Sequence, residues 1–397
     1  METQPDARVR DAESERTAEP ERSTQSNSPG PAASGRWPVL TRVVLAVAIF
    51  CLIEAWIFHS SFYADLLKPG SAAGSVRTTL QVEQHRQVRD RNQVLGVGDS
   101  RMPLWPRLTD GLRGETGYTF ANIATPGTYP RDWYYMLREV DPDRNRYSAI
   151  LIPMYEYEDD DWGDQSGEEV DIHYLAPLLR LSDMFEFSMS FPTWKLRKRA
   201  MRAILLRGLT YKQDFRDLLE HQDERMRELK WTRENLAQAR YDYRGPERND
   251  VGLEVDWAAQ KITNYPPGRT PAERAEFDMI LLRPVGPNTG QRAAYRRLWF
   301  GRIAHYYSGT RTRLVFFRVP RGPFVRPYPT NATTSVVREM AARGDAILLD
   351  QDLLDELEHP EFFMDAVHLN AAGCERFNPI LARAAARVLG PLSGGTH

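Results

Sequence analysis

Two short motifs near opposite ends of the chain carry residues that could form a nucleophilic site. Residues 93–102, QVLGVGDSRM, are a short apolar run that ends in Gly-Asp-Ser, which predicts that Ser100 lies exposed at the carboxyl end of a buried strand. Open α/β sheets keep their chemistry at that edge. A serine hydroxyl is a good nucleophile only when a base takes its proton. Near the other end, Asp365 and His368 supply an acid and a base just before a final helix.

The spacing of Asp365 and His368 suits a Ser-His-Asp site, because one turn of chain lets the acid orient the ring while the other nitrogen faces Ser100. Each residue also has a structural interpretation. Asp99 or Ser100 can cap a helix, Asp365 can cap a turn, and His368 can be a hydrogen-bonded interior histidine. The order and strand context of the two motifs favour catalysis.

A metal site is the competing arrangement, because His359, Asp365, His368 and Cys374 lie within sixteen residues. Their spacing matches no common zinc pattern, and a metal site would leave Gly-Asp-Ser without a role. We therefore expect neither a metal nor another cofactor.

Gly-Asp-Ser paired with a later Asp-x-x-His resembles the SGNH (GDSL-like) hydrolase superfamily, over about residues 92–158 and 288–390. Asn-Ile-Ala-Thr-Pro-Gly at 122–127 resembles the second block of the family, which implies that the N–H groups of Ser100 and Gly127 form the oxyanion hole. The third block departs from the family pattern. Pro-Met-Tyr-Glu-Tyr-Glu replaces Gly-x-Asn-Asp, so Tyr157 stands about where the family asparagine would and is the implied third donor.

The start of the chain is divided into a tail and an apolar segment. Residues 1–36 have the composition of a disordered tail. Residues 37–62 are long and apolar enough to cross a bilayer of ~30 Å, and the long tail before them favours an uncleaved anchor over a signal peptide or a buried core helix. Arg36 and Arg42 lie at the amino end of the span, which favours a tail on the cytoplasmic side and places the rest of the chain in the periplasm. Glu54, within the span, implies either a partner helix or snorkelling.

Strands and helices alternate through residues 92–390, which predicts a parallel sheet. Residues 63–91 are expected to form a polar connector and 391–397 a tail. Strands are expected before Ser100 and at 118–123, 149–152, 313–319 and 346–350, with helices at 103–113, 131–140, 291–307, 335–343 and 371–389. This rhythm predicts an α/β fold, a flavodoxin-like three-layer sandwich with a parallel sheet of about five strands.

Residues 159–286 interrupt the alternation as a long, mostly helical insertion. A connection of this length is typically functional, for example as a lid or a binding platform. Within it, residues 194–209, WKLRKRAMRAILLRGL, have an apolar face and a basic face. This pattern fits a helix on an anionic membrane surface, or a packed helix with a solvated basic face.

A serine activated by histidine forms an acyl-enzyme that passes its acyl group to water or to another hydroxyl. One anchor before an SGNH-like domain is similar to the cell-envelope members of the superfamily, the alginate O-acetyltransferase and D-alanyl-transfer proteins. The resemblance implies transfer of a small acyl group, first of all acetyl, onto an exported polysaccharide or other envelope glycan, with a multi-pass membrane-bound O-acyltransferase as donor.

Several alternatives stay open. The same triad would serve an esterase or deacetylase, and a membrane-anchored modifier of lipid or peptidoglycan would suit the basic helix. The absent third-block asparagine favours a noncatalytic scaffold of an envelope polysaccharide complex. A net charge of -2 argues against nucleic acid as a partner, and the two cysteines, Cys51 and Cys374, are not expected to form a disulfide.

Overall fold

The chain has two compact units, residues 1–52 and 53–397. The computed structural model describes residues 36–86, 92–104, 109–154, 169–236, 247–282, 290–325 and 336–390. In the first unit the described residues belong to helix α1 (Arg36–Glu54), whose apolar side chains from Val39 to Ile53 are exposed. The helical stretch Val39–His59 is long and apolar enough to cross a membrane.

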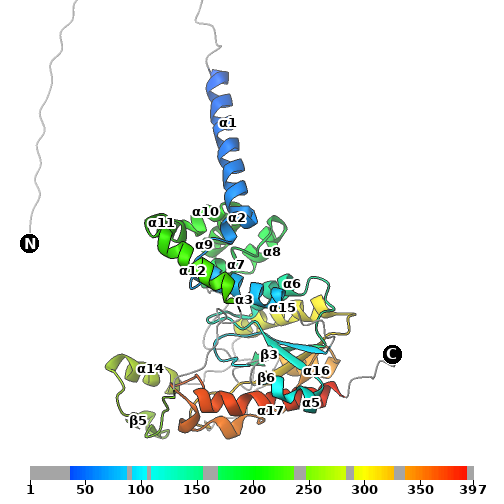
Figure 1. The fold of residues 1–397 in the computed structure, drawn as a ribbon, viewed down its shortest axis with the longest axis vertical. Helices are drawn as coiled ribbons and strands as arrows, with labels where there is room; N and C mark the ends of the chain where they lie inside the picture. The colour runs from blue at the N-terminus through cyan, green and yellow to red at the C-terminus, as the bar shows by residue number, and fades with distance from the viewer. Residues whose placement is uncertain are drawn as a thin grey trace, which may run out of the picture. The chain divides into compact units, whose positions relative to one another are not determined.

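A five-stranded sheet in the order β2-β1-β3-β6-β7 forms the centre of the second unit (Figure 1). Every pair of neighbouring strands in it is parallel, and Leu95 of β1 stands between Ala121 and Ile150 of its two neighbours. This confirms the predicted α/β class and the five-stranded parallel sheet. The strands are β1 (Gln93–Gly96), β2 (Thr119–Asn122), β3 (Ala149–Met154), β6 (Arg313–Arg318) and β7 (Ile347–Leu348).

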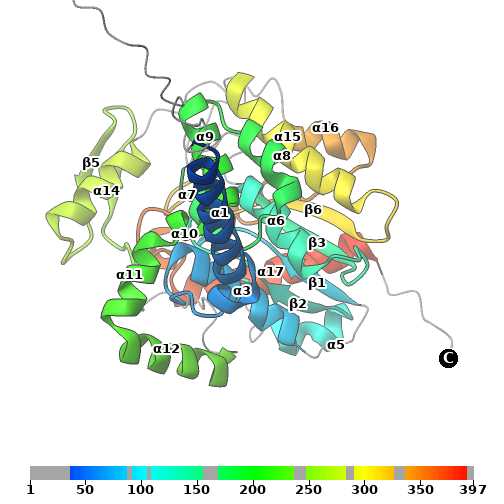
Figure 2. The ribbon, with the colours of Figure 1, turned by 90° about the horizontal axis from the view of Figure 1, so that it is seen from above.

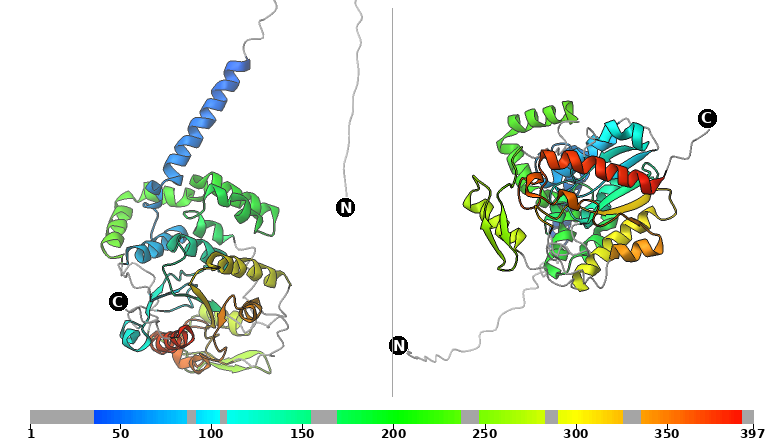
Figure 3. Two further views of the ribbon diagram at one scale, coloured as in Figure 1. Left: turned by 90° about the vertical axis from the view of Figure 1, so that its right-hand side faces the viewer. Right: turned by 90° about the horizontal axis from the view of Figure 1, so that it is seen from below.

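Helices cover both faces of the sheet, which explains why β1 and β3 are buried along their whole length. One face carries α3 (Ala72–His85), α6 (Pro130–Val140) and α15 (Gly290–Tyr307), as Figures 1 and 2 show. The opposite face carries α17 (Ala371–Leu389) and α5 (Arg113–Thr116), seen from below in Figure 3. The predicted helices at 131–140, 291–307 and 371–389 agree with α6, α15 and α17 within one residue, and α16 (Val336–Arg343) agrees with 335–343.

Two local predictions need correction. The helix expected at 103–113 is only partly correct for its described residues: Leu104 is buried in irregular chain, whereas residues 109–113 are helical, with a 3-10 turn, Asp110–Leu112, that leads into α5. Pro103 disfavours a helical conformation for Met102, the residue before it. The polar connector contains α3, which begins at an N-cap bond from the Gly74 N–H to Ser71 Oγ and adds Val76 to the main core.

The inserted residues form two parts. The first, residues 169–236, is called here the helical module and contains α7 (Val170–Leu175), α8 (Met184–Met189), α9 (Trp194–Leu205), α10 (Arg207–Thr210), α11 (Lys212–Glu220) and α12 (Gln222–Glu234). The second, residues 247–282, is the hairpin module, in which the antiparallel strands β4 (Glu254–Asp256) and β5 (Lys261–Asn264) lie beside α14 (Pro271–Leu281) (Figure 2). The hairpin module has its own small core around Ile262 and Phe277.

Candidate active site

Ser100, His368 and Asp365 form a continuous chain of hydrogen bonds. Ser100 Oγ lies 2.8 Å from His368 Nε2, although 268 residues separate the two in sequence. On the other side of the ring, Nδ1 lies 2.9 Å from Oδ2 and 3.0 Å from Oδ1 of Asp365. The structure therefore brings together all three residues that the sequence singles out for a nucleophilic site.

The chemistry of the three groups assigns the ring protons. A carboxylate only accepts hydrogen bonds, so His368 Nδ1 carries a proton and donates it to Asp365. In the neutral ring this leaves Nε2 as an acceptor for the hydroxyl proton of Ser100. The arrangement is therefore ready for proton transfer from serine to histidine.

Asp365 is held in its charged form by three donors. Partial burial favours the neutral acid, but the hydrogen bond from the His368 ring and the N–H groups of Val367 and His368 outweigh it and lower the pKa of Asp365. The two backbone bonds, of 2.9 and 2.8 Å, come from a loop closed by the Met364 N–H bond to the His368 carbonyl. The acid therefore orients both the ring and the loop that carries it.

The turn that carries Ser100 depends on a glycine. A Cβ at Gly98 would lie 2.8 Å from Met102 Cβ and 2.9 Å from Pro153 Cγ, so a larger residue would push the turn away from β3. Beyond it, Asp99 Oδ1 accepts the Arg101 N–H at 2.8 Å. In the described residues from 99 to 104 no helix begins, so Asp99 closes a turn rather than capping a helix, while the Ser100 hydroxyl points to the histidine.

The loop after β2 is bonded to the serine turn. The Gly98 carbonyl accepts the Thr125 N–H at 2.9 Å and the Thr128 hydroxyl at 3.0 Å. Asn122 fixes the start of the loop by donating to the Met102 carbonyl at 2.9 Å. Gly127 has a left-handed φ of 73°, and within the described part of the chain neither its N–H nor that of Ser100 has an assigned acceptor.

The helical module reaches this loop through one tyrosine. Tyr174 of α7 donates its hydroxyl proton to the Pro126 carbonyl at 2.7 Å. A Cβ at Gly127 would lie 2.8 Å from the hydroxyl oxygen of Tyr174. Arg131, at the start of α6, is fully buried and pairs with Asp171 of α7 at 2.9 Å. Sequence analysis missed Tyr174, because nothing near it in sequence indicates its distant partner.

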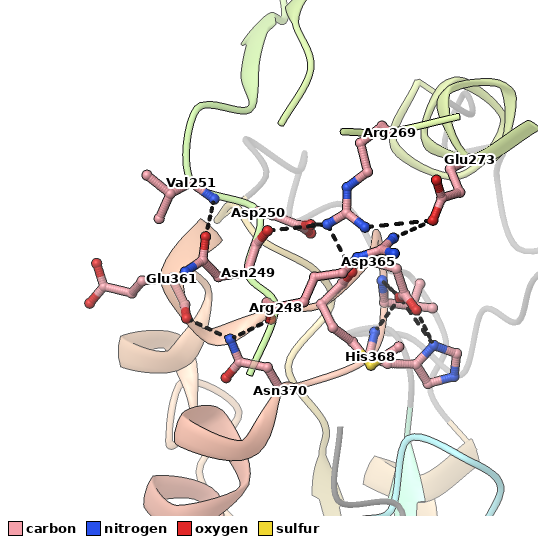
Figure 4. Close-up of polar contacts among 12 residues, drawn as sticks. Arg248, Asn249, Asp250, Val251, Arg269, Glu273, Glu361, Asp365, His368 and Asn370 are labelled. Atoms are coloured by element: carbon pink, nitrogen blue, oxygen red, sulfur yellow. Dashed lines mark hydrogen bonds and ion pairs between the residues drawn. The ribbon is translucent and has the colours of Figure 1, made fainter. Parts of the chain in front are cut away.

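The hairpin module contacts the loop of Asp365 and His368 (Figure 4). Arg269 Nη2 donates to the Met364 carbonyl at 2.9 Å and forms an ion pair with Asp250. Asp250 donates its own N–H to the Pro360 carbonyl at 2.8 Å. Asp250, near the start of the module, and Arg269, just before α14, thus hold the segment that carries the candidate base.

This ion pair lies inside the protein. Asp250 is completely buried and Arg269 is 5% exposed. Burial and the charge of Asp365 raise the pKa of Asp250, whereas the guanidinium in contact with it favours the charged carboxylate. A second buried pair holds the start of the same segment, since Arg321 Nη2 lies 2.6 Å from Glu358 Oε2. Neither pair was predicted, because lone arginines in a chain rich in arginine carry no signal.

The sequence also suggested site roles for Cys374, in a metal arrangement, and for Tyr157, as an oxyanion donor. Cys374 is in no disulfide and is buried in the main core. Within the described ranges, no group of three or more His, Cys, Asp and Glu side chains could hold a metal ion. Tyr157 lies outside the described residues, so its role as a third oxyanion donor stays a prediction.

No family model, no curated protein and no solved structure matches this chain. The resemblance to SGNH hydrolases therefore depends on the motifs themselves and on the arrangement of their residues.

Proposed function

We propose that the protein is a serine acyl-transfer enzyme of the SGNH type. The observation that carries the proposal is the hydrogen-bonded chain from Ser100 through His368 to Asp365. Such a chain lowers the cost of forming a serine nucleophile at neutral pH, because the imidazolium that results lies against a carboxylate.

The reaction has two halves with the same proton path. In the first, His368 Nε2 takes the proton of Ser100 as Oγ bonds to the acyl carbon, and the leaving group departs with that proton. In the second, an acceptor hydroxyl gives its proton to His368, attacks the acyl carbon and releases the Ser100 oxygen, which takes the proton back. The N–H groups of Ser100 and Gly127 would stabilise the oxyanion in both halves.

The position of Ser100 in the sheet supports this proposal. The order β2-β1-β3-β6-β7 corresponds to 2-1-3-4-5 in flavodoxin-like folds, whose ligands bind at the switch between the first and third strands. Ser100 follows β1 at that point. This strand order supports our proposal of a flavodoxin-like fold of the SGNH type for the second unit.

The physiological reaction that we propose is the transfer of an acyl group onto an exported polysaccharide or other envelope glycan, with acetyl as the leading candidate for that group. The apolar stretch Val39–His59 supports an anchored enzyme, and Arg36 and Arg42 before it favour a periplasmic catalytic unit. A multi-pass membrane-bound O-acyltransferase would supply the acyl group. The competing functions are hydrolysis by the same triad and a noncatalytic role in an envelope complex.

Incubation of the full-length protein with an activated, isotopically labelled acetyl ester tests the proposal. Intact-mass measurement should show one acetyl group on the protein and none on Ser100→Ala, whereas Ser308→Ala, at an exposed serine beyond α15, should react normally. Release of the label to a glycan rather than to water identifies a transferase. A folded wild-type protein that never acquires the label would leave the scaffold as the better interpretation.

A further inference from the structure

The end of the apolar span is held by the helical module. Residues 53–59 belong to the second unit, and Glu54 among them is only 6% exposed. Its carboxylate accepts the N–H of Gly208 in α10 at 2.9 Å. A Cβ at Gly208 would lie 2.6 Å from the Phe58 ring, so the Gly208 backbone packs directly against that ring. Glu54 thus has a partner within its own chain.

Aromatic rings extend this contact to α11. The Phe58 ring lies 4.9 Å from Tyr63 and 5.9 Å from Phe215, measured between ring centroids. Tyr63 donates its hydroxyl to Asp214 at 2.8 Å. The chain that leaves the span is therefore fixed to the helical module rather than joined to it by a free linker.

Several large apolar side chains are exposed at this end of the second unit. Helices α8, α9, α10 and α11 gather there (Figure 1). Trp56 and Phe62, which flank the end of the span, are 68% and 56% exposed and stack on each other. The exposed large apolar residues of these four helices are Phe185, Met189, Trp194, Leu205, Leu209, Phe215 and Leu219.

Helix α9 adds positive charge to the same surface. Trp194, Lys198, Arg202 and Leu205 are exposed and follow one another at intervals of three or four residues, so they share one face of the helix. Lys195 is exposed beside them. No acidic partner is assigned to these three cations within the described ranges. Aromatic and aliphatic side chains mixed with unpaired cations are typical of helices that lie in an anionic lipid interface.

We propose that these exposed residues of η1 (Ala55–His59), α2 (Ser61–Ala64) and α8 to α11 form a membrane-facing surface that lies among anionic lipid headgroups. The proposal rests on the proposed membrane anchor. If residues 39–59 cross a bilayer, the helices that contact residues 54–58 lie at its surface, where Trp side chains and cations are favourable. The surface would hold the catalytic unit against the membrane instead of letting it swing on the anchor.

A spin-label measurement on the full-length protein tests this. The background is the Cys51→Ser protein, in which the remaining cysteine, Cys374, is fully buried and should not react. One nitroxide is attached at Leu209→Cys, or at Met279→Cys on α14 as the control. Met279 is 63% exposed. Each protein is reconstituted in phosphatidylcholine vesicles with and without phosphatidylglycerol. We expect the label at 209 to be accessible to oxygen and shielded from a water-soluble nickel chelate, and the label at 279 to show the reverse.

Charge removal sharpens the test. Each cation near an anionic surface contributes about fivefold to binding. The triple variant Lys195→Gln, Lys198→Gln and Arg202→Gln should therefore lower the ratio of docked to undocked protein on the order of 100-fold. This loss should appear only when phosphatidylglycerol is present.

Two outcomes would contradict the proposal. If labels 209 and 279 are equally exposed to nickel in protein that resists a carbonate wash, the surface does not face the membrane, although the anchor stands. Protein that the wash removes would overturn the anchor as well.

Discussion

Arg269 donates a hydrogen bond to the backbone carbonyl of Met364, the residue immediately before the candidate acid Asp365. The donor comes from the hairpin module and the acceptor from the loop that carries the candidate base (Figure 4). The inserted module is therefore part of the framework that orients His368 toward Ser100. Arg269 contacts neither of them, so its expected role is that of a positioning residue.

Substitution of Arg269 should reduce acylation through the position of His368. Arg269→Gln alone leaves Asp250 buried without a cation, at a cost of about 3–5 kcal/mol in the free energy of unfolding. The double variant Arg269→Gln with Asp250→Asn avoids that charge. We expect it to fold, to acylate Ser100 about 10- to 100-fold more slowly, and to show a shifted pH profile for acylation.

Arg248→Gln is the matched control, because Arg248 pairs with the partly exposed Glu273 in the same module. Its acylation rate should stay within about twofold of the wild-type rate. Wild-type rate and pH profile in the folded double variant would show that the Met364 contact does not position the base.

The three residues of the hydrogen-bonded chain should contribute unequally to the acylation rate. Ser100→Ala and His368→Ala each remove a group that makes or breaks a bond, and each should lower the rate by about 10⁶-fold. Asp365→Asn should cost less, about 10⁴-fold, because the acid orients the ring without taking its proton. Single-turnover kinetics on folded variants would measure this order. A folded Ser100→Ala protein with full activity would exclude the serine mechanism.

The lowered pKa of Asp365 predicts a loss of stability in acid. The folded pKa lies below the ordinary value of about 4, so the folded state binds fewer protons than the unfolded state between the two values. The stabilisation is complete above the unfolded pKa and is lost as the pH falls through the folded one. Thermal unfolding from pH 7 to pH 3 should thus show a smaller decline for Asp365→Asn. Identical declines for the variant and the wild type would mean that Asp365 titrates normally.

Tyr174 should affect catalysis through the loop that carries Gly127. Tyr174→Phe removes the hydrogen bond to the Pro126 carbonyl, which is worth about 1 kcal/mol, and should slow acylation about fivefold. Gly127→Ala should slow it more, by roughly 10²-fold, because its φ is left-handed and the added Cβ meets the Tyr174 hydroxyl.

Tyr265→Phe is the control for Tyr174→Phe, since it removes a comparable hydroxyl, bonded to Asp278 on the hairpin module. Its acylation rate should not change. If Tyr174→Phe is equally silent, the tyrosine packs against the loop without fixing the position of Gly127.

Local features of the sequence determined most of the sheet and the identity of the three candidate residues. Apolar runs bounded by glycine and proline predicted the five strands, because the burial of a parallel strand on both faces requires such a run. Ser100 was placed at the end of β1 by the same pattern. The spacing of Asp365 and His368 needed only one turn of chain to bring the acid to the ring, and the structure has that contact.

Long-range packing decided the rest. The contact between Ser100 and His368 spans 268 residues, so it depends on the order of strands in the sheet and not on any local pattern. Helix α3 has a polar sequence, yet the face that carries Val76 is covered only once α6 and α7 fold against it. Arg269, one arginine among many, acquires its role when the hairpin module buries it beside the Met364 carbonyl, because a buried guanidinium needs a counter-charge, here Asp250, and Nη2 then donates to the nearby carbonyl.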